Sequence, residues 1–266
     1  MTHTLIRIIL VLALVLASCS FTETATAAAQ EVFDGFDGPA GSVPDPKLWD
    51  HDLGGGWGHG SELQVYTDSP DNARLDGQGN LVIEARRTPT GFTSARLVTR
   101  GKLDMLYGTV SARIKFPAGQ GIWSTFWMMG SNIDNVGWPR AGEIDIMELV
   151  NTGTRYNITL HGPQGDSDYL SGAGVARSGD VADLAQEFHT YWMKWHRDSI
   201  TVGIDDATLA EFTPASLPPG GTWAFNHPMH ALLSLAIGGK LAGPPADSTA
   251  FPVTMLVDWF RYSPSN

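Results

Sequence analysis

The sequence predicts an all-β protein made of one domain, and three observations lead to this fold class. Short runs of apolar and β-branched residues recur along the chain, separated by turns rich in Gly, Pro and Asp. The 266 residues include 30 glycines and 16 prolines, and only 17% are charged, which suits many turns between short strands. No long amphipathic helix is apparent in the sequence. A β-sandwich fits these observations, although other sandwiches and barrels fit them as well.

Residues 1–29 are predicted to be an export signal with a short tether, and residues 31–266 a single domain. The apolar run 8–17 is too short and wrongly flanked to span a membrane. The signal has two alternative ends. Leu-Ala-Ser-Cys at 16–19 resembles a bacterial lipobox, which would put a lipid on Cys19, whereas Ala-Ala-Ala at 27–29 resembles an ordinary cleavage site. We favour the lipobox. We therefore expect a bacterial protein that is secreted or held at the cell surface as a lipoprotein.

Charge and cysteine content limit the partners. The net charge is −11 and no basic run occurs, so nucleic acid and anionic membrane surfaces are poor partners, whereas a neutral polysaccharide is compatible. Cys19 is the only cysteine, so the chain cannot form an intrachain disulfide. None of the eight histidines shows the close spacing of a zinc site, so we predict no metal ligands from them.

The predicted strands follow the apolar and β-branched runs in chain order. They cover residues 81–86, 109–116, 156–161, 200–204 and 231–237. Residues 180–187 are expected to form at most a turn or two of helix. The glycine-rich segment 54–58 lacks the Lys-Ser/Thr ending of a phosphate loop, so we interpret it as a loop at the edge of a cleft.

One further strand, residues 141–150 with the sequence Ala-Gly-Glu-Ile-Asp-Ile-Met-Glu-Leu-Val, carries three carboxylates. Side chains alternate between the two faces of a strand, so Glu143 and Asp145 share a face and Glu148 is one residue out of phase. A single-residue bulge near Met147 would return Glu148 to the acidic face and leave the aliphatic side chains on the other. We therefore predict a bulged strand with one carboxylate face and one core face.

Three acids at this spacing cannot all ionise freely near neutral pH, because mutual repulsion raises the pKa of at least one of them. Cleavage of a glycosidic bond uses this division: a carboxylic acid protonates the leaving oxygen while a carboxylate attacks the anomeric carbon. Carboxyls on one strand lie close together. A separation of roughly 5–5.5 Å is typical of enzymes that retain the configuration of the anomeric carbon, whereas enzymes that invert it need roughly 6.5–9.5 Å. We predict retention. A solvent-facing strand edge and a cation site made of carboxylates are the alternatives.

Aromatic residues near this strand favour a sugar site. Trp123 and Trp127 lie upstream, Trp138 immediately precedes it, and His161 closes the strand that follows. Indoles offer flat apolar faces and a polar N–H, which suit stacking on sugar rings. Trp is also a common core residue, and a single His is more often structural than catalytic, so only the combination is indicative.

The motif Glu-Ile-Asp-Ile-Met-Glu at 143–148 resembles the active-site signature of glycoside hydrolase family 16, in its bulged, laminarinase-like form. The resemblance covers much of the chain, and the matching segments occur in the family's order. Before the acidic strand they are 36–49, 62–67, 79–85, 107–115 and 119–123, and after it 188–191, Trp195 and 255–259.

This resemblance implies a jelly-roll β-sandwich of two curved antiparallel sheets, with a concave cleft that binds a β-glucan. It further implies a retaining, endo-acting hydrolase, with endo-1,3-β-glucanase as the favoured activity and no catalytic cofactor. By position, Glu143 would be the nucleophile, Glu148 the general acid/base, and Asp145 the partner that tunes the nucleophile. Five more residues match positions that line the cleft and hold sugars in relatives: Trp123, Trp127, Trp138, Arg113 and His161.

Several recognition positions depart from the family pattern. His-Gly-Ser at 59–61 precedes Glu62 where relatives often have Asn, Ser-Leu-Ala stands at 234–236 where many have Asn-Leu-Ala, and Leu241 replaces a frequent Trp. The glycan linkage is therefore less determined than the chemistry. Hydrolysis or transglycosylation of mixed-linkage β-glucan or β-galactan remains an alternative, as does a glucan-binding protein without turnover. The three intact carboxylates argue against the last.

A structural calcium is also part of the resemblance, held partly by an early Glu and a late Asp. Here Gly35 stands at the early position and Asp258 alone remains, so the ligand set is incomplete. We expect a monomer.

Overall fold

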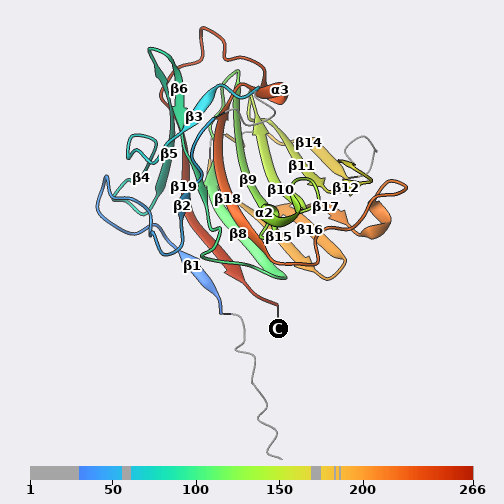
Figure 1. The fold of residues 1–266 in the computed structure, drawn as a ribbon. Helices are drawn as coiled ribbons and strands as arrows, with labels where there is room; N and C mark the ends of the chain where they lie inside the picture. The colour runs from blue at the N-terminus through green and yellow to red at the C-terminus, as the bar shows by residue number, and fades with distance from the viewer. Residues whose placement is uncertain (1–29, 56–60, 169–174, 183, 186, 266) are drawn as a thin grey trace, which may run out of the picture.

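The computed structural model describes residues 30–55, 61–168, 175–182, 184, 185 and 187–265. Two large β-sheets pack face to face, which confirms the predicted all-β class (Figure 1). The export signal and Cys19 lie outside the described residues. No helix in the described part of the chain is long and apolar enough to cross a membrane.

Nineteen strands and three short helices are assigned among the described residues. The ten-stranded sheet contains β1 (Val32–Asp34), β3 (Gln64–Tyr66), β4 (Ala73–Leu75), β5 (Leu81–Thr88), β6 (Gly91–Ser94), β8 (Gly108–Lys115), β15 (His189–His196), β16 (Ser199–Ile204), β17 (Ala207–Phe212) and β19 (Val253–Ser263). The seven-stranded sheet contains β2 (Asp50–His51), β7 (Arg96–Val98), β9 (Ile122–Gly130), β10 (Glu143–Val150), β11 (Arg155–His161), β14 (Ala176–Asp180) and β18 (Met229–Ile237). A hairpin of β12 (Pro163–Gln164) and β13 (Ser167–Asp168), helices α2 (Ile133–Val136) and α3 (Gly239–Ala242), and the 3-10 helix η2 (Pro214–Ser216) complete the fold.

The predicted strands are confirmed within one or two residues at each end as β5, β8, β11, β16 and β18. The helical turn considered at 180–187 does not form in the described residues, where Asp180 ends β14 and residues 182, 184 and 185 lie in turns. The seven-stranded sheet runs β14-β11-β10-β9-β18-β7-β2, so the acidic strand β10 lies between β11 and β9 near its middle.

Alternating side chains of both sheets fill the core. Phe126 of β9 and Phe260 of β19 are fully buried and meet edge to face at 6.4 Å between ring centroids, which joins the two sheets. Trp195 of β15 is also fully buried, and its indole N–H is satisfied because it donates to the carbonyl of Phe225 at 2.9 Å. One face of the seven-stranded sheet is therefore core, and the opposite face is free to carry a site.

Candidate active site

A β-bulge in β10 places all three acids on the face turned away from the core. Asp145 pairs with Trp127 of β9, but the next pair is Met147 with Phe126, so Ile146 has no partner in β9. The register against β11 shifts in the same interval, between Asp145 and Glu148. This confirms the bulge predicted near Met147. The aliphatic residues of the strand belong to the core: Ile144, Ile146, Met147 and Leu149.

Indole N–H groups hold the two glutamates at opposite ends of the acidic face. Nε1 of Trp138 donates to Oε2 of Glu143 at 3.0 Å, and Nε1 of Trp123 donates to Oε1 of Glu148 at 2.9 Å. The hydroxyl of Thr159 on β11 makes a longer contact, 3.4 Å, with the other oxygen of Glu148. The structure thus brings Trp123 and Trp138 to the acids, each as a hydrogen-bond donor.

Burial and charge repulsion give the two glutamates higher pKa values than ordinary surface carboxyls have. Burial, followed by the charge of Asp145, raises the pKa of Glu143 to about 7. The same two causes raise the pKa of Glu148 well above its usual value, and Glu148 is only 6% exposed. Both glutamates therefore hold a proton more strongly than ordinary surface carboxyls do. A raised pKa is what a carboxyl needs if it is to act as a proton donor near neutral pH.

His161, at the end of β11, supplies a positive charge to the acidic face. Its Nε2 lies 3.2 Å from Asp145 and 3.8 Å from Glu143, and its Nδ1 lies 2.8 Å from Oδ2 of Asp168. Burial alone would lower the pKa of His161, but hydrogen bonds to Asp145 and Asp168 and the nearby charges outweigh it and raise that pKa to about 11. The ring is therefore an imidazolium at neutral pH. The ring of Trp138 lies 5.8 Å away, centroid to centroid.

The same groups have the spacing of a cation site. Oxygen atoms of Glu143 and Asp145 and a nitrogen of His161 lie within 4.8 Å of one another. Both ring nitrogens of His161, however, face carboxylates and carry protons, and an imidazolium has no lone pair to give a metal. We therefore assign this cluster to proton chemistry.

Arg113 does not join the site, which corrects the prediction from the resemblance. It lies on β8 in the ten-stranded sheet, where Val110, Ala112 and Ile114 point into the core, so Arg113 faces the opposite outer surface of the sandwich. There its Nη1 pairs with Asp258 at 2.5 Å, and its guanidinium lies 4.8 Å above the ring of Phe188. Asp258, the remaining predicted calcium ligand, is occupied by this ion pair.

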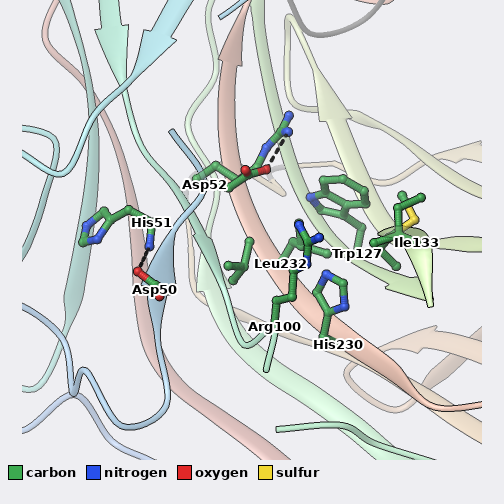
Figure 2. Close-up of a pocket in the computed structure, with 11 residues that line it drawn as sticks. Asp50, His51, Asp52, Arg100, Trp127, Ile133, His230 and Leu232 are labelled. Atoms are coloured by element: carbon green, nitrogen blue, oxygen red, sulfur yellow. Dashed lines mark hydrogen bonds and ion pairs between the residues drawn. The ribbon is translucent and has the colours of Figure 1, made fainter. Parts of the chain in front are cut away.

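Trp127 of β9 lies on the same face of the sheet as the three acids and lines a pocket beside them. Its Nε1 donates to the hydroxyl of Ser234 on β18 at 2.9 Å, and the guanidinium of Arg96 lies 5.3 Å from its ring. The pocket has a volume of about 430 Å³, and side chains from β9, β18, β7 and β2 line it (Figure 2). Trp127 pairs with Asp145, so the pocket lies on the same face of the sheet as the acids. Its lining residues are Asp50, His51, Asp52, Arg96, Val98, Arg100, Trp127, Met129, Ile133, His230 and Leu232.

The pocket combines paired charges with two buried histidine nitrogens, Nε2 of His51 and Nδ1 of His230, that have no hydrogen-bond partner among the described residues. Arg96 pairs with Asp52 at 3.4 Å, and Arg100 pairs with Asp134. Burial and the nearby positive charge of Arg100 lower the pKa of His230 to about 4, so this ring is neutral at working pH. Its Nδ1 is buried and has no hydrogen-bond partner among the described residues. A buried polar atom of this kind is available to a ligand hydroxyl.

The sequence analysis predicted Trp127 and named Ser234 as a departure from the family pattern, but it missed the place of Ser234 beside Trp127, the other pocket residues and Asp168. His230 precedes the predicted strand 231–237 by one residue, and the sequence does not show that this strand lies beside β9. For Asp168, a weak signal was present, because Gln-Gly-Asp-Ser at 164–167 is a turn that returns the chain toward His161.

A β-sandwich that presents two indole-bound glutamates and an ion-paired Asp and His on one sheet face is built like a hydrolase of glycosidic bonds. Comparison with known families agrees. Residues 61–261 match the model of the glycosyl hydrolases family 16, and the chain belongs to this family of glycoside hydrolases. The sandwich is accordingly the family's jelly roll, and family 16 hydrolases need no catalytic cofactor.

Named relatives lie within the same family. A beta-glucanase of Rhodothermus marinus is 38% identical over 233 residues, which cover 82% of this chain and 80% of the relative. A glucan endo-1,3-beta-glucosidase of Cryptopygus antarcticus is 34% identical, with 86% and 87% covered. The solved catalytic domain of an endo-1,3-beta-glucanase (laminarinase) from Thermotoga petrophila is 35% identical with a TM-score of 0.78, covering 89% of this chain and 98% of that one.

Proposed function

We propose that this protein is a retaining, endo-acting β-glucan hydrolase whose main substrate is a β-1,3-linked glucan. The observation that carries the proposal is the bulged strand β10, which holds Glu143 and Glu148 on one face with a separate indole donor for each. The printed activities of the relatives support the choice of glucan and of the 1,3 linkage.

In the first step, the Glu143 carboxylate attacks the anomeric carbon while the Glu148 carboxylic acid gives its proton to the glycosidic oxygen. The bond from the anomeric carbon to that oxygen breaks, one part of the glucan leaves as an alcohol, and the other remains as an ester on Glu143. The His161 imidazolium adjoins Glu143 and stabilises its charge, and Asp145 holds the ring through an ion pair.

In the second step, the Glu148 carboxylate takes a proton from water, and the resulting hydroxide attacks the anomeric carbon. The ester bond breaks, Glu143 is released as a carboxylate, and Glu148 is protonated again. Two displacements at one carbon retain its configuration. The two carboxyls thus act in turn, and water is the second reactant.

The pocket lined by Trp127, Arg96 and His230 binds glucosyl units away from the cleaved bond. Trp127 offers an aromatic face, and the unpartnered nitrogen of His230 accepts a sugar hydroxyl. His230→Ala is expected to raise KM for long glucans more than for short oligosaccharides. An equal effect on both lengths would remove this pocket from the binding path.

The test is reducing-end release from laminarin, mixed-linkage β-glucan and β-galactan, with products followed over time. Wild type should give early oligosaccharides from laminarin, and Glu143→Gln and Glu148→Gln should give almost none while still binding glucan, because the carboxamides keep the shape but cannot attack or donate a proton. Proton NMR of the first product should show the β-anomer. Near-normal turnover in Glu143→Gln would refute the nucleophile assignment, and an α-anomer would refute retention.

The same assay separates the other readings. Products longer than the starting oligosaccharide would indicate glycosyl transfer, and preferred release from the other two polymers would assign a different glycan. Binding to laminarin without release by wild type would indicate a glucan-binding protein.

We also infer that the chain is exported and acylated on Cys19. The lipobox-like segment Leu-Ala-Ser-Cys at 16–19 supports this, and the polar residues that follow would form the tether. Radiolabelled palmitate fed to expressing bacteria should enter the wild-type protein and not Cys19→Ser. Label in both proteins, or in neither with cleavage near residue 29, would contradict acylation.

A further inference from the structure

A fourth acid, Asp168, extends the line of charges behind the acidic face. Its Oδ2 lies 2.8 Å from Nδ1 of His161, and Nε2 of the same ring lies 3.2 Å from Asp145. Oδ1 of Asp168 accepts the backbone N–H of Gly162 at 3.1 Å. The side chain of Asp168 is only 11% exposed. Both of its oxygens are therefore committed, one to the ring and one to the backbone beside the ring.

The hairpin β12–β13 that carries Asp168 is fixed to its surroundings. The carbonyl of Pro163 accepts the N–H of Thr222 at 2.9 Å, and the side-chain amide of Gln164 donates to the carbonyl of Pro219 at 2.7 Å. On its exposed side, Arg140 donates to Asp166 at 2.8 Å. Asp168 is thus held in place by the hairpin, and it does not depend on His161 for its position.

A neutral imidazole ring carries one N–H proton and the imidazolium carries two, so the line Asp145–His161–Asp168 has one further proton to place. If both ring nitrogens carry protons, the charge of the ring lowers the pKa of Glu143. If the ring gives one proton up to a carboxylate of the line, the nearest being Asp168 at 2.8 Å and then Asp145 at 3.2 Å, this charge is lost and the pKa of Glu143 rises, so that less of Glu143 is ionised and able to attack. An Nδ1–H donated to a carboxylate favours the charged ring and directs the other N–H outward.

We propose that Asp168 is a positioning residue that keeps this proton on His161 and thereby keeps the nucleophile Glu143 ionised. The proposal rests on the roles proposed above for Glu143 and Glu148. Asp168 lies behind the ring, so it acts through His161 and has no contact with Glu143 itself.

The charged groups around the ring are consistent with this role. From β10 it faces Glu143 and Asp145, with Glu148 farther along the strand, and from β13 it faces Asp168. Trp138 covers the ring without adding charge. The cation Arg96, from β7, acts on Glu143 and not through the ring.

The test is Asp168→Asn, which keeps the shape and can still accept the Gly162 N–H but has no charge. If loss of the ring charge raises the pKa of Glu143 by one unit from about 7, its ionised fraction at pH 6 falls from about 9% to about 1%. We therefore expect kcat on laminarin at pH 6 to fall about ninefold. Binding of laminari-oligosaccharides, measured in a Glu148→Gln background, should be unchanged.

The direct readout is the ¹⁵N spectrum of the full-length protein with labelled histidine, the His161 signals being assigned with His161→Gln. Wild type should show His161 with two protonated nitrogens through pH 8, and Asp168→Asn should show a neutral ring there. Asp168→Glu restores a charge and should recover part of both the activity and the imidazolium signal. Asp166→Asn, on the same hairpin but exposed, should match wild type in both.

Three results would overturn the proposal. A neutral His161 in wild type does so without any variant, even if Asp168→Asn fails to fold. Normal kcat in folded Asp168→Asn, or lost activity with the imidazolium retained, would leave Asp168 with a structural role only. Failure of the proposed function is a separate result, because turnover by Glu143→Gln would expose it while the ¹⁵N spectra do not depend on activity.

Discussion

Replacing Trp138 with Phe removes one hydrogen bond from the nucleophile and leaves an aromatic ring in its place. In the native protein, Nε1 of Trp138 donates to Oε2 of Glu143 at 3.0 Å. A donor of this kind stabilises the charged carboxylate and lowers its pKa. Trp138→Phe should therefore raise the pKa of Glu143 and reduce the fraction of enzyme that can attack at low pH.

The size of the effect follows from the exposure of the bond. A hydrogen bond to a charged group contributes about 1.5–3 kcal/mol when buried, but Trp138 is 41% exposed, so we take about 1 kcal/mol after solvent screening. This corresponds to a shift of about 0.7 pKa unit. From a pKa of about 7, the ionised fraction of Glu143 at pH 6 would fall from about 9% to about 2%.

The assay is the pH dependence of kcat/KM on laminarin, which reports the free enzyme. The acidic limb of the profile should move to higher pH by about 0.7 unit. At pH 6, kcat/KM should fall about fourfold to fivefold beyond any change in the plateau. Trp123→Phe is the matched comparison, because its N–H binds Glu148 instead. Trp123→Phe should raise the pKa of the general acid and move only the alkaline limb, to higher pH.

An acidic limb that stays in place or moves downward in Trp138→Phe would refute the assignment of that limb to Glu143. The same acidic shift in Trp123→Phe would show that the two indoles do not act on separate acids. A lower plateau alone is uninformative about the pKa, because either ring can also contact sugar.

Three further changes test the architecture. Arg113→Met should leave kcat/KM on laminarin unchanged and alter the free energy of unfolding by less than about 1 kcal/mol, because Arg113 lies on the outer face of the other sheet; a clear loss of activity would contradict that placement. Gly130→Ala would make a Cβ collide with the carbonyl oxygen of Ala141 and displace the segment that enters β10, so both Tm and kcat should fall; a native Tm with normal kcat would argue against this contact. Phe126→Ala empties a fully buried site and should reduce the free energy of unfolding by about 3–5 kcal/mol in denaturant titrations; a loss under about 1 kcal/mol would mean that the core refills.

The acidic strand could be predicted in detail because its information is local. Alternation shows which residues of a strand share a face, and the conflict between Glu148 and its two neighbouring acids required a bulge, which the register confirms. The strands β5, β8, β11, β16 and β18 were likewise predictable from their own composition.

The wrong prediction for Arg113 shows what local sequence cannot determine. Alternation with Val110, Ala112 and Ile114 puts Arg113 on the outer face of its strand, but it does not say which sheet the strand joins. β8 pairs with β15 and β19, both much later in the chain, and those pairings carry Arg113 away from the acids. The family pattern was matched in sequence, but the position in space was different.

The positions of Ser234 and His230 beside β9 could not be predicted for the same reason. Ser234 meets Trp127 across 107 residues of chain, and His230 pairs with Met129 across the same two strands. Pairings at such distances depend on how the whole sheet is assembled. The pocket and the line behind His161 could therefore be found only from coordinates.

The strict alternation along β18 has a consequence for directed evolution of this enzyme. His230, Leu232 and Ser234 face the ligand side, whereas Ala231 and Leu233 belong to the core. Odd and even positions of one strand therefore form two sets that can be randomised separately. A combinatorial library restricted to the ligand-side set would vary the residues that face the glycan and leave the core side chains of β18 unchanged.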